Sequence, residues 1–105
     1  MTAADILEAA AGHMKNRAAT YDSEEGERSM GKTVDMFNTL YSKDLTEEQG
    51  WAFMAILKLV RSSQGDYRAD NYEDHTAYAA LMGEAAYEDA RHKDEAYLLR
   101  DSCKK

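Results

Sequence analysis

The 105-residue sequence predicts an all-α fold, a bundle of four to five helices in a single domain. It contains no proline and only six glycines, so residues that break helices are rare. Apolar residues recur at helical spacing along most of the chain, whereas the alternation typical of strands never persists. A chain of this length builds one core. We expect the domain to span residues 1–101 and residues 102–105 to form a fraying tail.

Thr2 and Asp5 are spaced as in a capping box and predict the start of the first helix. Helical spacing then continues to Tyr21. The acidic stretch 22–27 contains a glycine and predicts a loop. A second helix follows, and its apolar stripe is formed by Met30, Val34, Phe37 and Leu40.

Thr46 and Gln49 form a clearer capping box, T-x-x-Q, at the start of the third helix. Apolar residues over 51–60 occupy nearly all faces of this helix, which predicts that it is the central one. A polar turn with a glycine comes next. Asp70 then predicts the start of the fourth helix, with Glu73 at the capping-box position. Helical spacing continues toward the tail, as an extension or as a fifth helix.

Twenty acidic residues against thirteen basic ones give a net charge of −7. This balance argues against direct binding of nucleic acid, which needs a basic surface. It leaves open an acidic patch that docks onto a basic partner protein, and the other interpretation of the same residues is a solvated loop. The candidate docking residues are Asp22, Glu24, Glu25 and Glu27. Tyrosine is enriched at interfaces, so Tyr87 and Tyr97 mark a second candidate partner face.

The composition also bears on location and on chemistry. No apolar stretch approaches the ~20 residues that span a bilayer, and the N-terminus lacks the pattern of a secretory signal. The single cysteine, Cys103, cannot form an internal disulfide. We therefore expect a cytoplasmic protein that does not engage a membrane. The three histidines are scattered, and neither a phosphate-binding glycine loop nor a nucleophile elbow occurs. We expect no metal site, no cofactor and no catalytic residue.

The main polar signal lies on the third and fourth helices. Lys58 and Arg61 are three residues apart and leave one side of an apolar helix, where a cation is costly unless it is paired or solvated. Asp70 and Asp74 share one face of the next helix, with Tyr78 one turn further on. A short turn makes the two helices antiparallel neighbours. These residues therefore form either an internal salt-bridge network or a charged pocket for a phosphate or nucleotide.

Arg17 and Tyr21, four residues apart, either pair with each other or join this cluster. Together with K-x-x-R at 58–61 and D-x-x-x-D-x-x-x-Y at 70–78, they resemble a family of small bacteriophage and prophage proteins over about residues 5–86. We interpret the chain as a non-enzymatic phage accessory protein. Its small size, acidity and many tyrosines favour binding to a host or phage protein in the infected bacterium, for host takeover or counter-defence.

The layout is similar, more remotely, to the MazG-like all-α nucleoside triphosphate pyrophosphohydrolases, which hold magnesium with paired carboxylates on successive helices. This similarity implies nucleotide handling and, by analogy, a homodimer. Here Lys58 and Arg61 stand where carboxylates would be needed, and Asp70 and Asp74 are too few for the metal cluster. The alternative function is therefore nucleotide binding or a degenerate hydrolase. A structural bundle in a larger phage assembly is the third interpretation.

Overall fold

The computed structural model describes the backbone of residues 1–21 and 29–103, and the side chains of residues 1–17 and 29–95. Within the described backbone there are four α-helices and no strand, so the predicted all-α class is confirmed. The helices are α1 (Ala3–Tyr21), α2 (Ser29–Tyr41), α3 (Glu47–Ser62) and α4 (Ala69–Cys103).

The predicted capping boxes form at the starts of α1 and α3. The backbone N–H of Thr2 donates to Oδ2 of Asp5 over 2.9 Å, and the N–H of Asp5 donates to Oγ1 of Thr2 over 3.2 Å. At α3, the N–H of Gln49 donates to Oγ1 of Thr46 over 3.1 Å, and the N–H of Thr46 donates to Oε1 of Gln49 over 3.0 Å. Each box provides acceptors for amide groups that a helix start leaves without partners.

The start of α4 differs in detail from the expected capping box. The helix begins at Ala69, one residue before the predicted start, and Asp70 lies in its first turn. The Asp70 carboxylate accepts a hydrogen bond from Nε of Arg68 over 3.3 Å. Glu73 is buried and contacts His13 of α1 at 2.8 Å. The Glu73 carboxylate thus contacts His13 instead of capping the start of α4, as its spacing from Asp70 had predicted.

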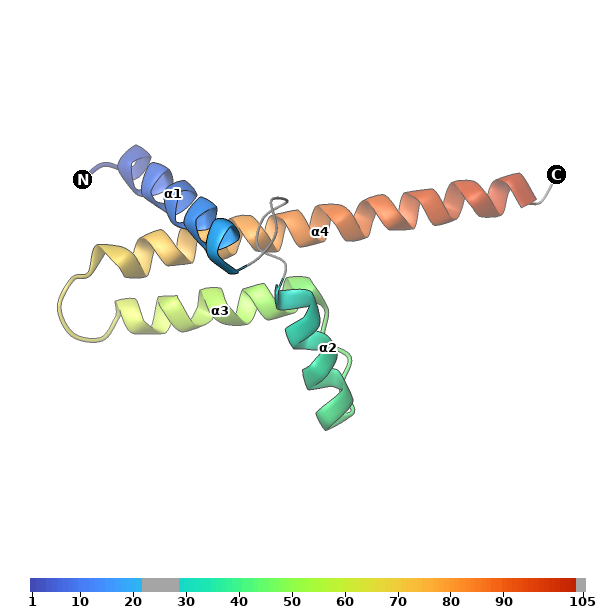
Figure 1. Cartoon of the computed structure of the whole chain (residues 1–105), viewed down its shortest axis with the longest axis horizontal. Coiled ribbons are helices and arrows are strands. Elements are labelled where there is room, and N and C mark those ends of the chain that lie inside the picture. The colour runs from blue at the N-terminus through green and yellow to red at the C-terminus, as the bar shows by residue number, and fades with distance from the viewer. Residues whose placement is uncertain (22–28, 104–105) are drawn as a thin grey trace.

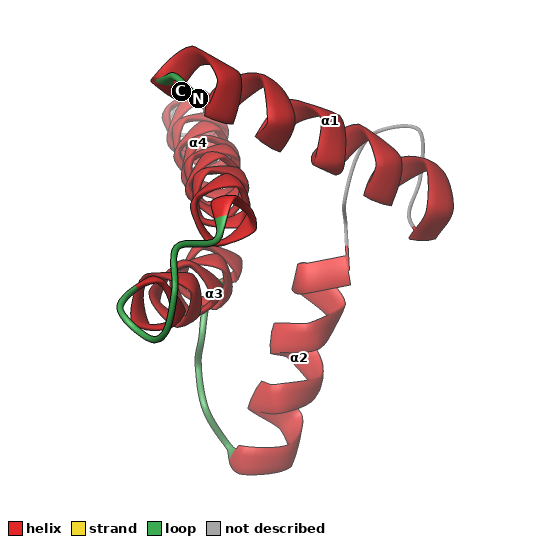
Figure 2. Cartoon of the chain, turned by 90° about the vertical axis from the view of Figure 1, so that its left-hand side faces the viewer, coloured by secondary structure: helices red, strands yellow, loops and turns green. Residues whose placement is uncertain are grey.

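α3 and the first half of α4 form an antiparallel hairpin, and α1 lies across α4 (Figure 1). Figure 2 shows α1 and α2 on the same side of this hairpin. α2 packs against α3 alone, because no described Cα atom of α2 lies within 8 Å of α1 or α4. α4 continues unbroken past Tyr87 to Cys103, so of the two alternatives the extension is observed, and it also includes the first residues of the expected tail. Its far end extends beyond the other helices, and the molecule measures 61 × 33 × 25 Å.

The core is small and lies between α3 and α4. Its buried cluster comprises Trp51, Ala55, Tyr78 and Leu81. The rings of Trp51 and Tyr78 stack with centroids 5.7 Å apart. Met14 of α1 and Met30 of α2 pack against the sides of this cluster, so all four helices contribute to one core.

α2 approaches α3 most closely at Gly50. A Cβ atom at this position would lie 2.5 Å from Sδ of Met30 and 2.8 Å from Cγ1 of Val34. Both distances are shorter than van der Waals contact permits, and packed interiors leave little room for adjustment. The missing side chain at Gly50 therefore allows α2 to rest on α3.

Candidate functional site

A partly buried carboxylate, Asp74, joins three helices. Its Oδ2 lies 3.0 Å from Nζ of Lys58 on α3, and its Oδ1 lies 3.4 Å from Nη2 of Arg17 on α1. The side chains of Asp74 and Lys58 are only 13% and 12% exposed. The guanidinium carbon of Arg17 also lies 5.9 Å from the ring centroid of Tyr78, within cation–π distance. These four predicted residues therefore meet in one network that connects α1, α3 and α4.

A second polar contact between α1 and α4 lies beside this network. Nε2 of His13 is 2.8 Å from Oε1 of Glu73, whose side chain is 11% exposed. The sequence interpretation missed His13 because it considered histidines only as metal ligands. A signal was present, since His13 and Arg17 are four residues apart and share one face of α1. Glu73 and Asp74 are adjacent on α4. Glu73 contacts His13 of α1, and Asp74 contacts Arg17 of α1.

The other two charged members of the predicted cluster lie apart from Asp74. Asp70 is exposed and pairs with Arg68 at 3.3 Å. Arg61 is exposed and forms no ion pair with the described residues. The structure therefore brings Lys58 and Asp74 together but does not bring Asp70 into the same ion-pair network.

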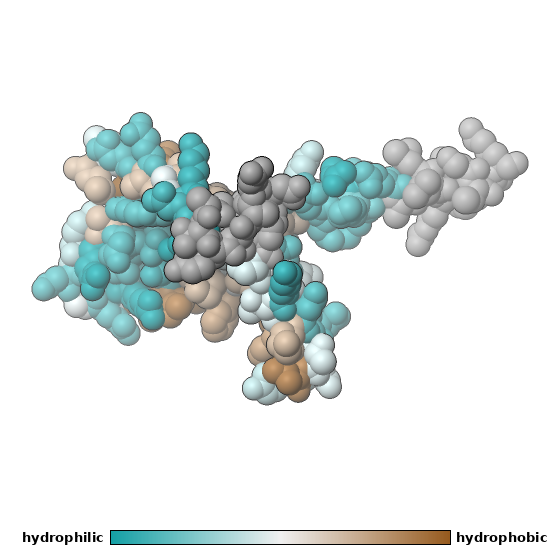
Figure 3. Space-filling model, viewed as in Figure 1, coloured by the Kyte–Doolittle hydropathy of each residue, from teal (hydrophilic) through white to brown (hydrophobic). Residues whose placement is uncertain are grey.

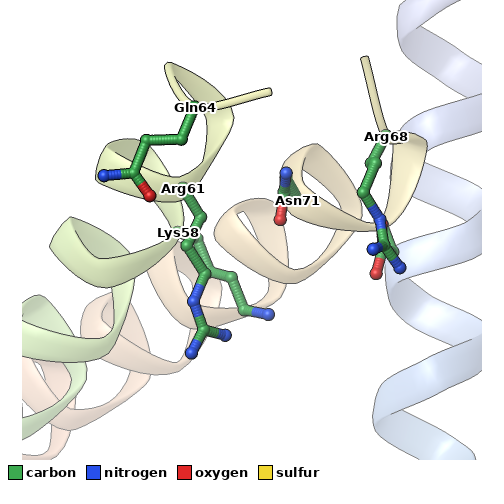
Figure 4. A pocket seen from close by; sticks show the side chains of 6 residues that line it. Lys58, Arg61, Gln64, Arg68 and Asn71 are labelled. Atoms are coloured by element: carbon green, nitrogen blue, oxygen red, sulfur yellow. The ribbon is translucent and has the colours of Figure 1, made fainter. Parts of the chain in front are cut away.

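Arg61 and Asp70 instead meet Lys58 at an open cleft between the end of α3 and the start of α4 (Figure 4). This cleft has a volume of about 320 Å³. Its lining carries three cations and one carboxylate in a chain whose net charge is −7. We refer to it as the basic cleft, and its lining residues are Lys58, Arg61, Gln64, Arg68, Asp70 and Asn71.

The residues expected to bind a partner are placed only in part. Tyr87 is 65% exposed on the part of α4 that extends beyond α3. Tyr21 and Tyr97 belong to α1 and α4, but their side chains lie outside the described residues. The acidic candidates also lie outside the described residues, namely Asp22, Glu24, Glu25 and Glu27.

α2 and α3 expose large apolar side chains on and around the groove between them. The sequence predicted burial of nearly every side of α3, yet Phe53 is 70% exposed and Ile56 is 59% exposed. A groove of about 340 Å³ runs between the two helices, and apolar side chains form most of its lining. Apolar atoms gather on these helices in Figure 3. We refer to this surface as the apolar face, and its exposed members are Phe37, Leu40, Leu45, Phe53, Ile56 and Val60.

The described side chains provide ion pairs and anion-attracting groups rather than a set of metal ligands. No three His, Cys, Asp or Glu side chains among them lie close enough together to hold a metal ion. The most buried acid of the expected pocket, Asp74, is shared by two cations. None of the helices, over the residues described, is long and apolar enough to cross a bilayer.

The chain belongs to the family described as domain of unknown function (DUF6378), whose profile matches residues 5–86. The matched range contains α1, α2, α3 and the first half of α4. It therefore includes the network of Arg17, Lys58 and Asp74, the contact between His13 and Glu73, the basic cleft and the apolar face. No significant match is found among curated proteins or among solved structures.

Proposed function

We propose that the chain is a non-enzymatic binding protein that works as a homodimer, joined through the apolar face of α2 and α3. The observation that carries this proposal is the extent of exposed surface. The chain exposes 8038 Å², whereas a folded monomer of 11.8 kDa exposes about 5,900 Å². The excess of about 2,100 Å² is larger than the ~800 Å² that each partner buries in a standard interface.

The shape of the chain supports the same conclusion. The radius of gyration is 16.9 Å, compared with about 13 Å for a compact domain of this length. No large side chain of the described residues is fully buried. The extending half of α4 accounts for part of the extra surface, and the apolar face accounts for another part. A second chain on that face would enlarge a core that one chain builds only in part.

A second copy is the occupant that suits this surface. Two chains of charge −7 repel each other, so a stable homodimer needs an interface without like charges. The groove between α2 and α3 meets this requirement, because no ionisable side chain lines it. Its polar members are the neutral Thr33 and Gln49. Homodimer interfaces are also more apolar than transient ones.

We further propose that the homodimer acts as an accessory protein of a phage or prophage, in the cytoplasm of an infected bacterium, where it binds a host or phage protein. The residue pattern over 5–86, the acidic charge balance and the exposed Tyr87 support this context. The alternative, nucleotide hydrolysis, has less support, because Asp74 is shared between Lys58 and Arg17 and the described residues offer no carboxylate cluster for magnesium.

The oligomeric state tests the proposal. Sedimentation velocity from micromolar to submillimolar concentration should give a species of twice 11.8 kDa for the wild-type chain. Phe53→Glu should give a monomer with unchanged helix content, because Phe53 is exposed within one chain. Leu7→Glu is the matched control, since Leu7 is 60% exposed on α1 and lies away from the apolar face.

A wild-type monomer at every concentration would overturn the homodimer. A dimer that survives Phe53→Glu and Ile56→Glu equally would place the interface elsewhere and also contradict the proposal. If the wild-type chain is a monomer and a captured protein protects the apolar face from hydrogen exchange, the occupant is a different chain.

A further inference from the structure

Asn71 is a buried amide side chain without a partner. The residue is 8% exposed, and its side chain makes no hydrogen bond within 3.5 Å to the described residues, although its backbone N–H donates to the carbonyl of Arg68. An asparagine side chain carries two donor hydrogens and an acceptor oxygen. Buried groups of this kind are nearly always paired in native proteins. Because Asn71 lines the basic cleft, the missing partner belongs in that cleft.

The charges around Asn71 indicate the sign of this partner. In Figure 4, Asn71 of α4 is seen between Lys58 and Arg61, which extend from α3, and Arg68. Arg68 is paired with Asp70, but Arg61 has no ion pair among the described residues. An arginine that stays unpaired in a chain of net charge −7 is available to an incoming anion. Lys58 is paired with Asp74 and Arg68 with Asp70, so Arg61 carries the unbalanced positive charge at this cleft.

The start of α4 adds to this attraction. Its first turn contributes Asp70 and Asn71 to the lining. The first amide groups of a helix point their hydrogens out of its N-terminus and favour a bound anion. Among the described side chains, none caps these groups of α4. The helix end alone would not define a site, but it lies at the same cleft as the unpaired Arg61 and the buried Asn71.

We propose that the basic cleft binds a small phosphate anion. The unpaired guanidinium of Arg61 attracts its negative charge, and guanidinium and amide donors match its several acceptor oxygens. A volume of about 320 Å³ is at the lower end for ligand pockets. It leaves room for an ester substituent, so the phosphate group belongs either to inorganic phosphate or to a small phosphate monoester. The site is separate from the apolar face and does not depend on dimerisation.

Titration of the full chain with inorganic phosphate, phenyl phosphate and succinate at low ionic strength tests this site. Two-dimensional amide NMR spectra should show saturable shifts at residues 61–71 with both phosphates. Arg61→Gln and Asn71→Asp should each weaken phosphate binding by about tenfold, the usual size of one charge-assisted hydrogen bond. Arg91→Gln is the matched control, because it removes the same charge from an exposed arginine of α4 outside the cleft. This control should leave the affinity within about twofold.

The ligand series separates the two sources of the phosphate group. Tighter binding of phenyl phosphate assigns the site to a monoester, and equal binding assigns it to the free ion. Succinate binding as tight as phosphate would overturn the phosphate assignment. The absence of saturable shifts, or equal weakening by Arg91→Gln, would overturn the site itself. Arg61 is exposed, so its variant should keep the wild-type spectrum in the unbound form and keep the test interpretable.

Discussion

The two sides of α3 differ in how completely a single chain buries their apolar side chains and pairs their charges. Toward α4, Trp51 stacks on Tyr78 and the partly buried Lys58 is neutralised by Asp74. Toward solvent, Phe53 and Ile56 stand exposed beside a groove that only α2 partly covers. Both sides are apolar in sequence. Under the proposed homodimer, the difference means that an apolar helix position indicates burial in the assembly, which need not be burial within one chain.

The largest expected effect on stability comes from the side of α3 that faces α4. Asp74→Ala should lower the free energy of unfolding by about 3–5 kcal/mol, because it leaves Lys58, whose side chain is only 12% exposed, without its counter-charge. Urea denaturation followed by circular dichroism measures this change. Asp70→Ala is the control, since its pair with Arg68 is exposed, and it should cost less than about 1 kcal/mol. Equal losses for the two variants would mean that Asp74 has no special role.

Trp51 and Phe53 allow a direct comparison of the two sides within one turn of helix. Trp51→Ala should lower the free energy of unfolding by about 3–5 kcal/mol, because Trp51 is buried in the core. Phe53→Ala should change it by less than about 0.5 kcal/mol at protein concentrations where the chain is monomeric. Thermal unfolding at low concentration tests both. A large loss for Phe53→Ala under these conditions would show that Phe53 is buried within a single chain.

Gly50→Ala should loosen the contact between α2 and α3. The added methyl group meets Met30 and Val34, and overpacking costs about 1–3 kcal/mol. Replacing glycine by alanine inside a helix stabilises it by about 1 kcal/mol. The free energy of unfolding should therefore fall by about 1 kcal/mol in total. Gly83→Ala is the control, because a Cβ atom there would meet nothing within 4 Å. It should be neutral or stabilising, and a stabilising Gly50→Ala would contradict the close approach of α2.

The smallest expected effect concerns the cap of α1. Hydrogen bonds from the backbone N–H and then the side chain of Thr2 hold the pKa of Asp5 below its ordinary value of 3.8. A lowered pKa in the folded chain means that this contribution to stability is complete above the pKa of the unfolded chain. It is lost as the pH falls through the lower pKa of the folded chain. NMR titration of the Asp5 carboxyl carbon checks this, and a midpoint at or above 3.8 would mean that the cap is open.

Local features were the most predictable part of the molecule. The capping boxes at Thr2 and Thr46 depend on residues three positions apart, so the sequence alone places both helix starts. The approach of Lys58 to Asp74 also follows from sequence, because a short turn folds their two helices against each other. The partner of Glu73 does not follow in this way. His13 lies 60 residues away in the chain. This tertiary contact takes the place of the local capping box that the three-residue spacing of Asp70 and Glu73 predicted.

The candidate sites were harder to predict for a related reason. Helical spacing shows that Phe53 and Ile56 are apolar neighbours on α3. It carries no information on whether the same chain buries them. Arg68 and Asn71 fall at a turn and a helix start, where polar residues have an ordinary structural explanation. Only the three-dimensional arrangement shows that Asn71 is buried without a partner beside Arg61.

The extending half of α4 has a consequence for the dynamics of the chain. Its residues 87–95 are exposed on every side. Within this segment Arg91 pairs with Glu88 and Glu95, and Lys93 pairs with Asp89. Such i,i+3 and i,i+4 pairs contribute only about 0.3–0.5 kcal/mol each. The amide protons of this segment should therefore exchange with solvent through local opening, while those near Trp51 and Tyr78 exchange only through global unfolding. One helix thus spans both extremes of local stability, and a partner bound along its far half would be detected as new protection there.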